Sequence, residues 1–370
     1  MAFDAVVVGG GLAGVSVAHA LVGLGCSTLL VDRADPGRAT DAGAGILSPE
    51  TTHNPDDAWF NLAFECGAAY RDLVPTLHDP GYSRCGLLTI SLPDWPDSYF
   101  EEAANLALSR QAHRGQPPSD ELSEISSEQA RDMFPPLGPV SRALLHQGAA
   151  RVDGRKMCAA LLGAAQAQGL KARVGSMERI VLDGGRATAV DIDGERVTTA
   201  NVIIAGGAWS SAFADLLGVP VAVQPWRGQI IHLGVEGTAT WPIVQPILSH
   251  YLVPWPDGRV AVGATVEPHA GFDARATVSG VLQLLGEAVK TAPGLADATF
   301  LEVRVGLRPV SDDGQPLLGP VPGAANVHLA TGYGADGLLL SPGCGRLVAA
   351  VAVGQNPTID ITPWSVSRFM

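Results

Sequence analysis

Three glycines near the N-terminus have the spacing of a phosphate-binding turn. Gly9, Gly11 and Gly14 form the pattern G-x-G-x-x-G in "VVVGGGLAG", directly after an apolar run and before a helical pattern. The first glycine permits a tight turn, the second lets the backbone approach a pyrophosphate, and the third lets helix and strand pack closely. Asp32 ends the next apolar run, where an acid suits ribose hydroxyls. We predict a dinucleotide site here, which also includes Leu12, Ala13 and Arg33.

A second glycine-rich stretch indicates which dinucleotide is bound. "ATGYGADG", residues 330–337, also precedes a helical pattern, so it directs a second helix N-terminus at an electron-rich group. In FAD this group is the flavin C2=O/N1 edge, where negative charge accumulates on reduction. A nicotinamide-binding domain would continue as an uninterrupted doubly wound sheet, whereas strand-rich segments interrupt this one early. The pattern favours FAD.

A single arginine stands alone in "GLRPVSDDGQPLLGP", residues 306–320. Arg308 has no basic neighbour in this stretch, and two interpretations are open. It could pair with Asp312 or Asp313 on the surface, or its planar fork of donors could bind a carboxylate in a site.

The elements that position these residues form an α/β pattern with an added antiparallel part. A strand over residues 3–8, a helix over 15–24 and a strand over 27–31 predict a βαβ unit. Segments 172–204 and 221–265 are rich in strands and tight turns. Further helices are expected around residues 99–111, 155–168 and 277–291, a late strand at 326–330, and a glycine-broken helix at 338–353.

Composition excludes several classes of protein. A chain of 370 residues exceeds one ordinary core, so we expect two domains. The net charge of −13 excludes a nucleic-acid footprint, and no basic cluster suggests a membrane surface. The five scattered cysteines form neither a disulfide framework nor a metal pattern, so we expect reduced thiols, no metal and a cytoplasmic location. Glycines interrupt the apolar segment 5–26, and Asp4 replaces a basic leader, which argues against a signal or membrane helix.

Five ordered blocks then resemble a known family. They are "DAVVVGGGLAGVSVA" with Asp32, "ATDAGAGILSP", "VDGRKMCAALLGAAQAQG", "NVIIAGGAWS", and "VGLRPVSDDGQPLLGP" with "NVHLATGYGADGLLLSPGCGRL". With them the chain resembles the D-amino-acid oxidase superfamily of FAD-dependent oxidoreductases, in the branch of glycine oxidase and D-amino-acid dehydrogenase. The resemblance implies a discontinuous Rossmann-like FAD-binding domain, residues 1–80, 146–218 and 300–370. Residues 81–145 and 219–299 would form a substrate domain with a mixed, mainly antiparallel sheet.

The resemblance also implies which residues hold the cofactor. Residues along the flavin and pyrophosphate would be Ala44, Gly45, Ile46 and Leu47; the adenine side would meet the backbone of Val174; the ribose would lie under Ala205, Gly206 and Trp209; the flavin pyrimidine would lie at Gly334, Ala335, Asp336, Gly337 and Leu338. Some relatives attach flavin through a cysteine after the G-L-R-P block. Residues 309–313 contain none, so the FAD is expected to be non-covalent.

For catalysis, the resemblance implies that Arg308 clamps the carboxylate of a substrate at the flavin. Tyr251 would bind the same carboxylate, with ordinary sheet packing as the alternative, and His250 would face the other side of its strand. Relatives that oxidise glycine and sarcosine often read G-H-x-R-N-G where this chain has "GYGADG". Tyr333 takes the histidine position in the site, and Ala335 replaces the arginine, which favours a substrate bulkier than glycine.

The implied reaction is oxidation of an amino acid at its C–N bond. Hydride transfer to flavin N5 would give an imine, which water converts to a keto acid and ammonia; O2 or a quinone would take the electrons. This reaction demands no side-chain base, because orientation and desolvation supply much of the catalysis. Two alternatives remain open: oxidation of a 2-hydroxy acid or a specialised intermediate, and a non-catalytic flavoprotein subunit, against which Arg308 and Tyr251 argue. A homo-oligomer is compatible with the sequence.

Overall fold

The computed structural model describes residues 2–52, 54, 56–113 and 121–370, and it contains the predicted βαβ unit at its N-terminus. Strands β1 (Ala2–Val8) and β2 (Thr28–Asp32) are parallel neighbours, connected by helix α1 (Leu12–Gly23). Successive side chains of β1 point to opposite faces of the sheet and so pack into two different hydrophobic cores. Ala5 and Val7 face the cluster under α1, whereas Val6 and Val8 face the cluster on the other side of the sheet.

The first sheet has the strand order β10-β11-β12-β1-β2-β9, extended by β19 beside β12 and by β18 beside β19. Its parallel centre is flanked by antiparallel strands. The further strands of this sheet are β9 (Lys171–Val174), β10 (Met177–Asp183), β11 (Arg186–Ile192), β12 (Glu195–Ile204), β18 (Leu317–Val321) and β19 (Ala324–Thr331). Helices of this half are α2 (Ala39–Ala42), α3 (Asp57–Leu73), α6 (Gly154–Ala167), α7 (Ala214–Leu217) and α9 (Gly337–Ala352).

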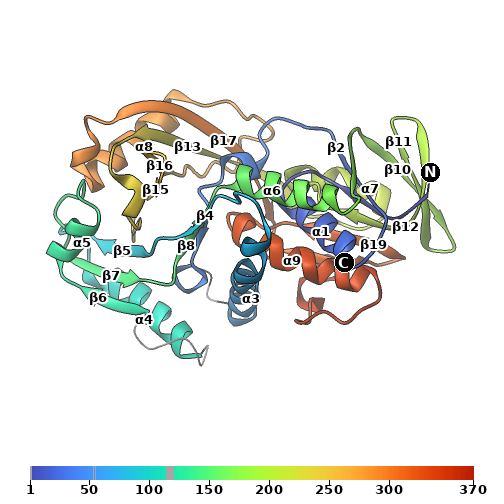
Figure 1. Ribbon diagram of the computed structural model, residues 1–370, viewed down its shortest axis with the longest axis horizontal. Helices are drawn as coiled ribbons and strands as arrows, with labels where there is room; N and C mark the ends of the chain where they lie inside the picture. The colour runs from blue at the N-terminus through green and yellow to red at the C-terminus, as the bar shows by residue number, and fades with distance from the viewer. Residues whose placement is uncertain (1, 53, 55, 114–120) are drawn as a thin grey trace.

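The second sheet forms the other lobe (Figure 1), with the order β17-β13-β16-β15-β14-β5-β7-β6. All neighbours pair antiparallel except β14 and β5. Its strands are β5 (Leu87–Ser91), β6 (Leu122–Ile125), β7 (Arg142–His146), β13 (Val223–Gly234), β14 (Ile243–Pro246), β15 (Tyr251–Trp255), β16 (Arg259–Gly263) and β17 (Thr299–Ser311). Helices α4 (Asp97–His113), α5 (Ser127–Met133) and α8 (Val278–Thr291) belong to this lobe.

A small third sheet, β3-β8-β4, joins the lobes through β3 (Ile46–Leu47), β4 (Tyr82–Arg84) and β8 (Ala150–Val152). The predicted fold class, a Rossmann-like half with a mixed and mainly antiparallel second sheet, is confirmed. The domain boundaries stay a prediction. One of them cuts β17 at residue 300, and the structure corrects this: β17 pairs with β13 along its length and so lies in the second sheet.

The last helix, α9, is continuous rather than broken by its glycines. Gly343 allows α3 to approach, because a Cβ there would lie 2.5 Å from Cys66 Sγ, and one at Gly345 would lie 2.7 Å from Ser16 Cβ on α1. The glycines therefore mark close helix contacts. Pro342 lies in the first turns of α9, which run on through it.

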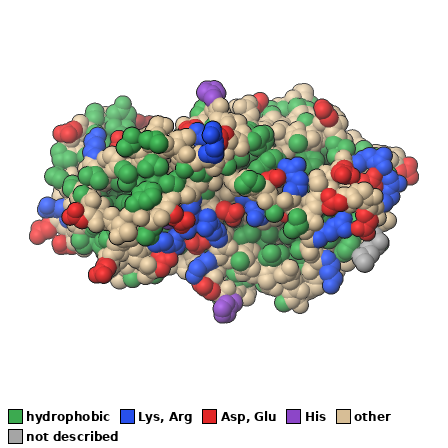
Figure 2. All heavy atoms as spheres, turned by 90° about the horizontal axis from the view of Figure 1, so that it is seen from above, with side chains coloured by type: hydrophobic (Ala, Val, Ile, Leu, Met, Phe, Trp, Pro, Cys, Tyr) green, Lys and Arg blue, Asp and Glu red, His purple; other side chains and the backbone are tan. Residues whose placement is uncertain are grey.

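The surface carries an apolar area over the lobe of α8. Figure 2 shows hydrophobic side chains gathered at that end of the molecule, where Val278 is 78% and Leu282 65% exposed. Homo-oligomer formation stays a prediction. Within the described part of the chain, no helix is both long and apolar enough to cross a bilayer, and the expected cytoplasmic location stays a prediction. The same described residues hold no cluster of His, Cys, Asp and Glu suited to a metal.

Candidate active site

A cavity of about 550 Å³ runs between the two lobes and receives residues from both. At one end it is lined by Gly9, Asp32 and Gly175; at the other by Tyr251 and Arg308. The glycine turn, the C-terminal glycine patch and the second sheet therefore meet at one site, although they are far apart in the sequence.

The glycine turn depends on glycine for steric reasons. Gly9 has a φ of +115°, and a Cβ there would clash with the carbonyl oxygen of Ala205. A Cβ at Gly14 would clash with the backbone of Gly9, so Gly14 lets α1 pack on β1 and does not itself line the cavity. Gly11, Leu12 and Ala13 do line it, and the residue at the start of α1, Gly11, has no side chain to cap the helix. The positive end of α1 therefore lies at the cavity wall, where it suits a phosphate.

Asp32 is fixed at the cavity wall by its own neighbours. Its carboxylate accepts hydrogen bonds from the backbone N–H groups of Gly10 at 2.5 Å and Ala34 at 2.7 Å, and Arg38 approaches it at 3.4 Å. The predicted Arg33 lines the cavity as well. Sequence reasoning missed two residues here: Arg38, and Thr40, whose hydroxyl accepts the N–H of Leu12 at 2.9 Å.

The other predicted cofactor residues divide into those that line the cavity and those that do not. Those that line it are Ala44, Gly45, Ile46, Ala205, Gly206, Trp209, Gly334, Ala335, Asp336, Gly337 and Leu338. Leu47 instead packs in the core beneath α1 and α3. Val174 points to solvent, and its neighbours Gly175 to Met177 line the cavity in its place. At the start of α9, burial raises the pKa of Asp336 to about 6.

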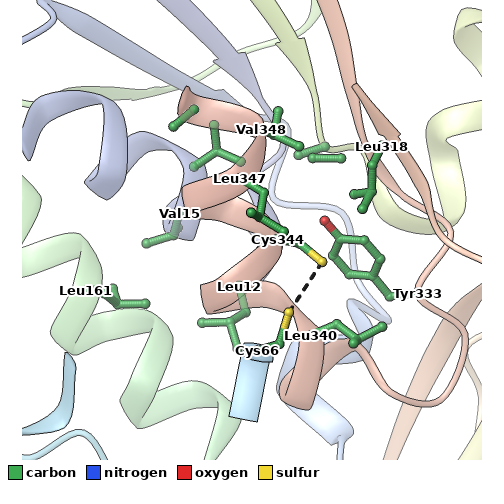
Figure 3. Close-up of a cluster of buried hydrophobic side chains, with 14 of the residues drawn as sticks. Leu12, Val15, Cys66, Leu161, Leu318, Tyr333, Leu340, Cys344, Leu347 and Val348 are labelled. Atoms are coloured by element: carbon green, nitrogen blue, oxygen red, sulfur yellow. Dashed lines mark hydrogen bonds between the residues drawn. The ribbon is translucent and has the colours of Figure 1, made fainter. Parts of the chain in front are cut away.

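Tyr333 requires a correction. Tyr333 borders the cavity, but its ring lies in the hydrophobic cluster beneath α1 and α9. Figure 3 shows its hydroxyl between Leu318 and Cys344. Burial, together with the nearby thiols of Cys344 and Cys66, raises its pKa well above the usual range. The two sulfur atoms are 3.7 Å apart (Figure 3), and Cys344 packs in the hydrophobic cluster. The orientation of its hydroxyl into the core argues against the predicted catalytic role for Tyr333.

Arg308 faces the cavity rather than the surface. Its guanidinium donates to the carbonyl oxygens of Thr265 at 2.9 Å and Arg227 at 3.4 Å. Asp312 instead accepts from Gln224, and Asp313 pairs with Arg368. The surface ion-pair interpretation is therefore wrong. A Cβ at Gly228 would lie 2.5 Å from Arg308 Cζ, so the guanidinium lies in space that only glycine leaves open.

Tyr251 has a similar support. It pairs with Gly263 across β15 and β16, and a Cβ at Gly263 would lie 2.8 Å from the phenol oxygen. Burial raises the pKa of Tyr251 to about 12, while the charge of Arg308 acts in the opposite direction. The phenol therefore remains a hydrogen-bond donor over the physiological range. His250 lies outside the cavity lining, with its ring 3.1 Å from Gln283.

Polar residues beside Tyr251 were missed by sequence reasoning. Val244 pairs with Leu252, a register that places Gln245 opposite Tyr251 on the cavity side of the sheet. Ser48 and Thr51 line the same end, and their hydroxyl oxygens are 2.9 Å apart. No local pattern marks Gln245, because it meets Thr51 and Tyr251 only through contacts between segments that are distant in the sequence.

Comparison with known proteins identifies the family. A model of the DAO family, described as FAD dependent oxidoreductase, matches residues 4–351. Glycine oxidase of Pseudomonas putida is 32% identical over 377 residues, which cover 99% of this chain and 98% of that protein. The crystal structure of iminodiacetate oxidase from Chelativorans sp. BNC1 matches with a TM-score of 0.91 at 34% identity, covering 98% of both chains. That of glycine oxidase from Geobacillus kaustophilus shares the fold, with a TM-score of 0.90 at 24% identity and coverage of 100% and 99%. The protein belongs to the DAO family of FAD-dependent oxidoreductases.

The cofactor of this family, FAD, fits the residues present. The cavity is lined by a strand-end carboxylate, the start of α1 at Gly11 and the start of α9 at Asp336. These groups suit a ribose, a pyrophosphate and the electron-rich edge of a flavin. The prediction of FAD as the cofactor is confirmed, whereas its non-covalent attachment stays a prediction.

Proposed function

We propose that the protein oxidises the C–N bond of an amino acid, with Arg308 and Tyr251 binding the substrate carboxylate. One observation carries this: both side chains face the cavity that the glycine turn also lines, each over a glycine that makes room for it. A guanidinium and a phenol that stays protonated form a donor pair suited to a carboxylate. Glycine oxidase and iminodiacetate oxidase, whose names describe amine oxidation, support the same reading.

When bound, FAD supplies the hydride acceptor, and the chain supplies binding and orientation. Arg308 is held by the carbonyl oxygens of Thr265 and Arg227, so its free donors point in a fixed direction. Holding the carboxylate at two points orients the Cα–H bond of the substrate and lowers the entropic cost of reaction. Ala335 lines the cavity where relatives carry an arginine, which leaves space for a substrate side chain.

The test is anaerobic mixing of the FAD-loaded protein with amino acids and 2-hydroxy acids, while the flavin absorbance is followed. We expect amino acids to bleach the flavin and hydroxy acids to leave it oxidised. Bleaching by hydroxy acids alone would instead support the alternative substrate class, and no bleaching by either would support a non-catalytic subunit. Re-exposure to O2 or to a quinone then identifies the electron acceptor.

A further inference from the structure

A buried polar cluster lies behind the cavity wall, at the end that holds Gln245 and Tyr251. Ser48 follows β3 and lines the cavity, and its Oγ is 2.8 Å from Nδ1 of His146 at the end of β7. Nε2 of the same ring is 3.8 Å from the carboxylate of Glu50. Ser48, Glu50 and His146 are each no more than 3% exposed. Ser48, His146 and Glu50 thus follow one another in space, from the cavity wall into the interior of the protein.

The turn that carries Ser48 and Glu50 is held in place from behind. Arg110, on α4, is buried and donates to the carbonyl oxygens of Glu50 at 3.1 Å and Thr52 at 2.5 Å. These bonds fix the backbone of residues 49–52, so that Thr51 and Ser48 face the cavity.

A second carboxylate, partly exposed to solvent, lies next to the cluster. A Cβ at Gly148 would lie 2.9 Å from Nε2 of His146 and 2.7 Å from Oε2 of Glu121, so the ring and this carboxylate both pack against the same glycine. The side chain of Glu121 is 21% exposed, and Arg84, which is more exposed, approaches it at 3.5 Å. Among the described residues, the charged groups close to His146 include Glu50 and Glu121, with Arg84 beside Glu121.

Amine oxidation starts from the neutral amine, so a group that removes a proton from the bound substrate would speed it at neutral pH. An amino acid enters at neutral pH as an ammonium ion, and hydride cannot leave its Cα until the nitrogen has lost a proton and regained its lone pair. We propose that Ser48 and His146, with Glu50, take this proton from the substrate ammonium group and pass it towards Glu121 and solvent. This inference rests on the proposed function.

The transfer balances in protons and charge. The hydroxyl of Ser48 receives the ammonium proton as its own proton moves to Nδ1 of His146, and the ring becomes an imidazolium. This requires Nε2–H on the neutral ring, the tautomer that the carboxylate of Glu50 favours. The same carboxylate stabilises the imidazolium, whose Nε2 proton then passes to the neighbouring carboxylate of Glu121, which is partly exposed to solvent. The substrate keeps the electron pair on nitrogen.

The test is the rate of anaerobic flavin reduction at saturating amino acid, measured from pH 6 to 10 in wild type, His146→Gln and Ser48→Ala. A general base typically contributes about 100-fold or more. We expect each variant to be slowed roughly 100-fold near pH 7 and to approach the wild-type rate near pH 10, where solvent removes the proton. The rising limb of the pH profile should therefore move to higher pH, towards the pKa of the substrate amine.

His232→Gln is the matched control, because His232 is equally buried, lies in the same sheet and contacts Arg259 away from the cavity. In His232→Gln the rising limb of the pH profile should stay at the wild-type pH. If His146→Gln does not fold, Ser48→Ala carries the test. The proposed relay would be overturned if the rising limb of the pH profile did not move in Ser48→Ala and His146→Gln. It would also be overturned if these variants lowered the rate equally at every pH. A wild type whose flavin no amino acid reduces contradicts the proposed function instead, so the two failures are distinguishable.

Discussion

The guanidinium of Arg308 lies over Gly228, in the space that the Cβ of any other residue would fill. Arg308 lies on β17 and Gly228 on the neighbouring strand β13. Arg308 pairs with Trp226, so Gly228 is two residues further along β13. Two features therefore fix the position of Arg308: the lack of a side chain at Gly228 and the hydrogen bonds to its two carbonyl partners. This relationship links the substrate-binding group to the sheet beneath it.

Replacing Arg308 should abolish efficient turnover while leaving FAD in place. A buried carboxylate without its partner costs about 2–5 kcal/mol, or roughly 30- to several thousand-fold in kcat/KM for Arg308→Ala. Arg308→Lys should also fail substantially, because a point charge does not reproduce the planar fork. Steady-state kinetics with flavin occupancy measured alongside provide the check. Arg304→Lys, on the same strand but paired with Glu302, is the control and should turn over normally.

Gly228→Ala should reproduce much of this defect without touching a charged residue. The added methyl group displaces the guanidinium, so kcat/KM should fall about 10- to 100-fold, as expected for a small misplacement of a positioning group. The comparison is Gly234→Ala at the end of the same strand, where the nearest atom to a new Cβ is 3.3 Å away on a flexible leucine. Equal kinetics in the two variants would contradict the steric argument.

Asp32→Ala should weaken FAD binding and leave the fold largely intact. Loss of a charge-assisted hydrogen bond to ribose costs about 1.5–3 kcal/mol. The carboxylate also holds the N–H groups of Gly10 and Ala34, which adds to the loss by loosening the turn. Titration of apoprotein with FAD measures the change, with the exposed Asp183→Ala as the control. An unchanged affinity would make Asp32 a turn residue only.

The β1–α1–β2 unit and its glycine turn could be predicted because their signals are local: an apolar run, a glycine spacing and an acid at a strand end. Arg308 could be singled out by its isolation and by its sequence block. The supporting Gly228, Gly263 and Gln245 could not, because their roles arise only when strands distant in sequence pair in one register. The inward orientation of Tyr333 likewise depends on how α3 packs on α9, which no local pattern encodes.

The substrate should be larger than glycine. Ala335 contributes little volume and no charge to the cavity wall, at the position where the sequence resemblance leads us to expect an arginine in an enzyme for small substrates. Wild type should reduce its flavin faster with bulkier amino acids than with glycine or sarcosine, and Ala335→Arg should lower the rate with bulky substrates about tenfold or more. Stopped-flow reduction with a side-chain series measures both. A wild type that prefers glycine would refute this inference.

Acid should destabilise the fold through buried neutral histidines. Burial lowers the pKa of His328 to about 4 from 6.5, and His328 is 2% exposed in β19. Between these values the unfolded chain binds the proton and the folded chain does not, so stability is present above pH 6.5 and is lost as pH falls towards 4. The loss is about 1–3 kcal/mol. Urea unfolding at pH 7.5 and pH 5 should show a smaller acid loss in His328→Gln than in wild type; equal losses would exclude His328 as a source.

The order in which the chain is made has a consequence for cofactor loading. The parallel strand β19 lies beside β12, and α9 packs on α1, so elements late in the chain complete a half that starts with β1. The FAD cavity needs both Gly9 and the Gly334–Leu338 segment. During synthesis the N-terminal strands and α1 leave the ribosome first. Their apolar faces stay exposed until β19 and α9 have been made and can pack on them. The FAD site is therefore complete only after the Gly334–Leu338 segment has been made, and free FAD at that stage should favour folding over aggregation.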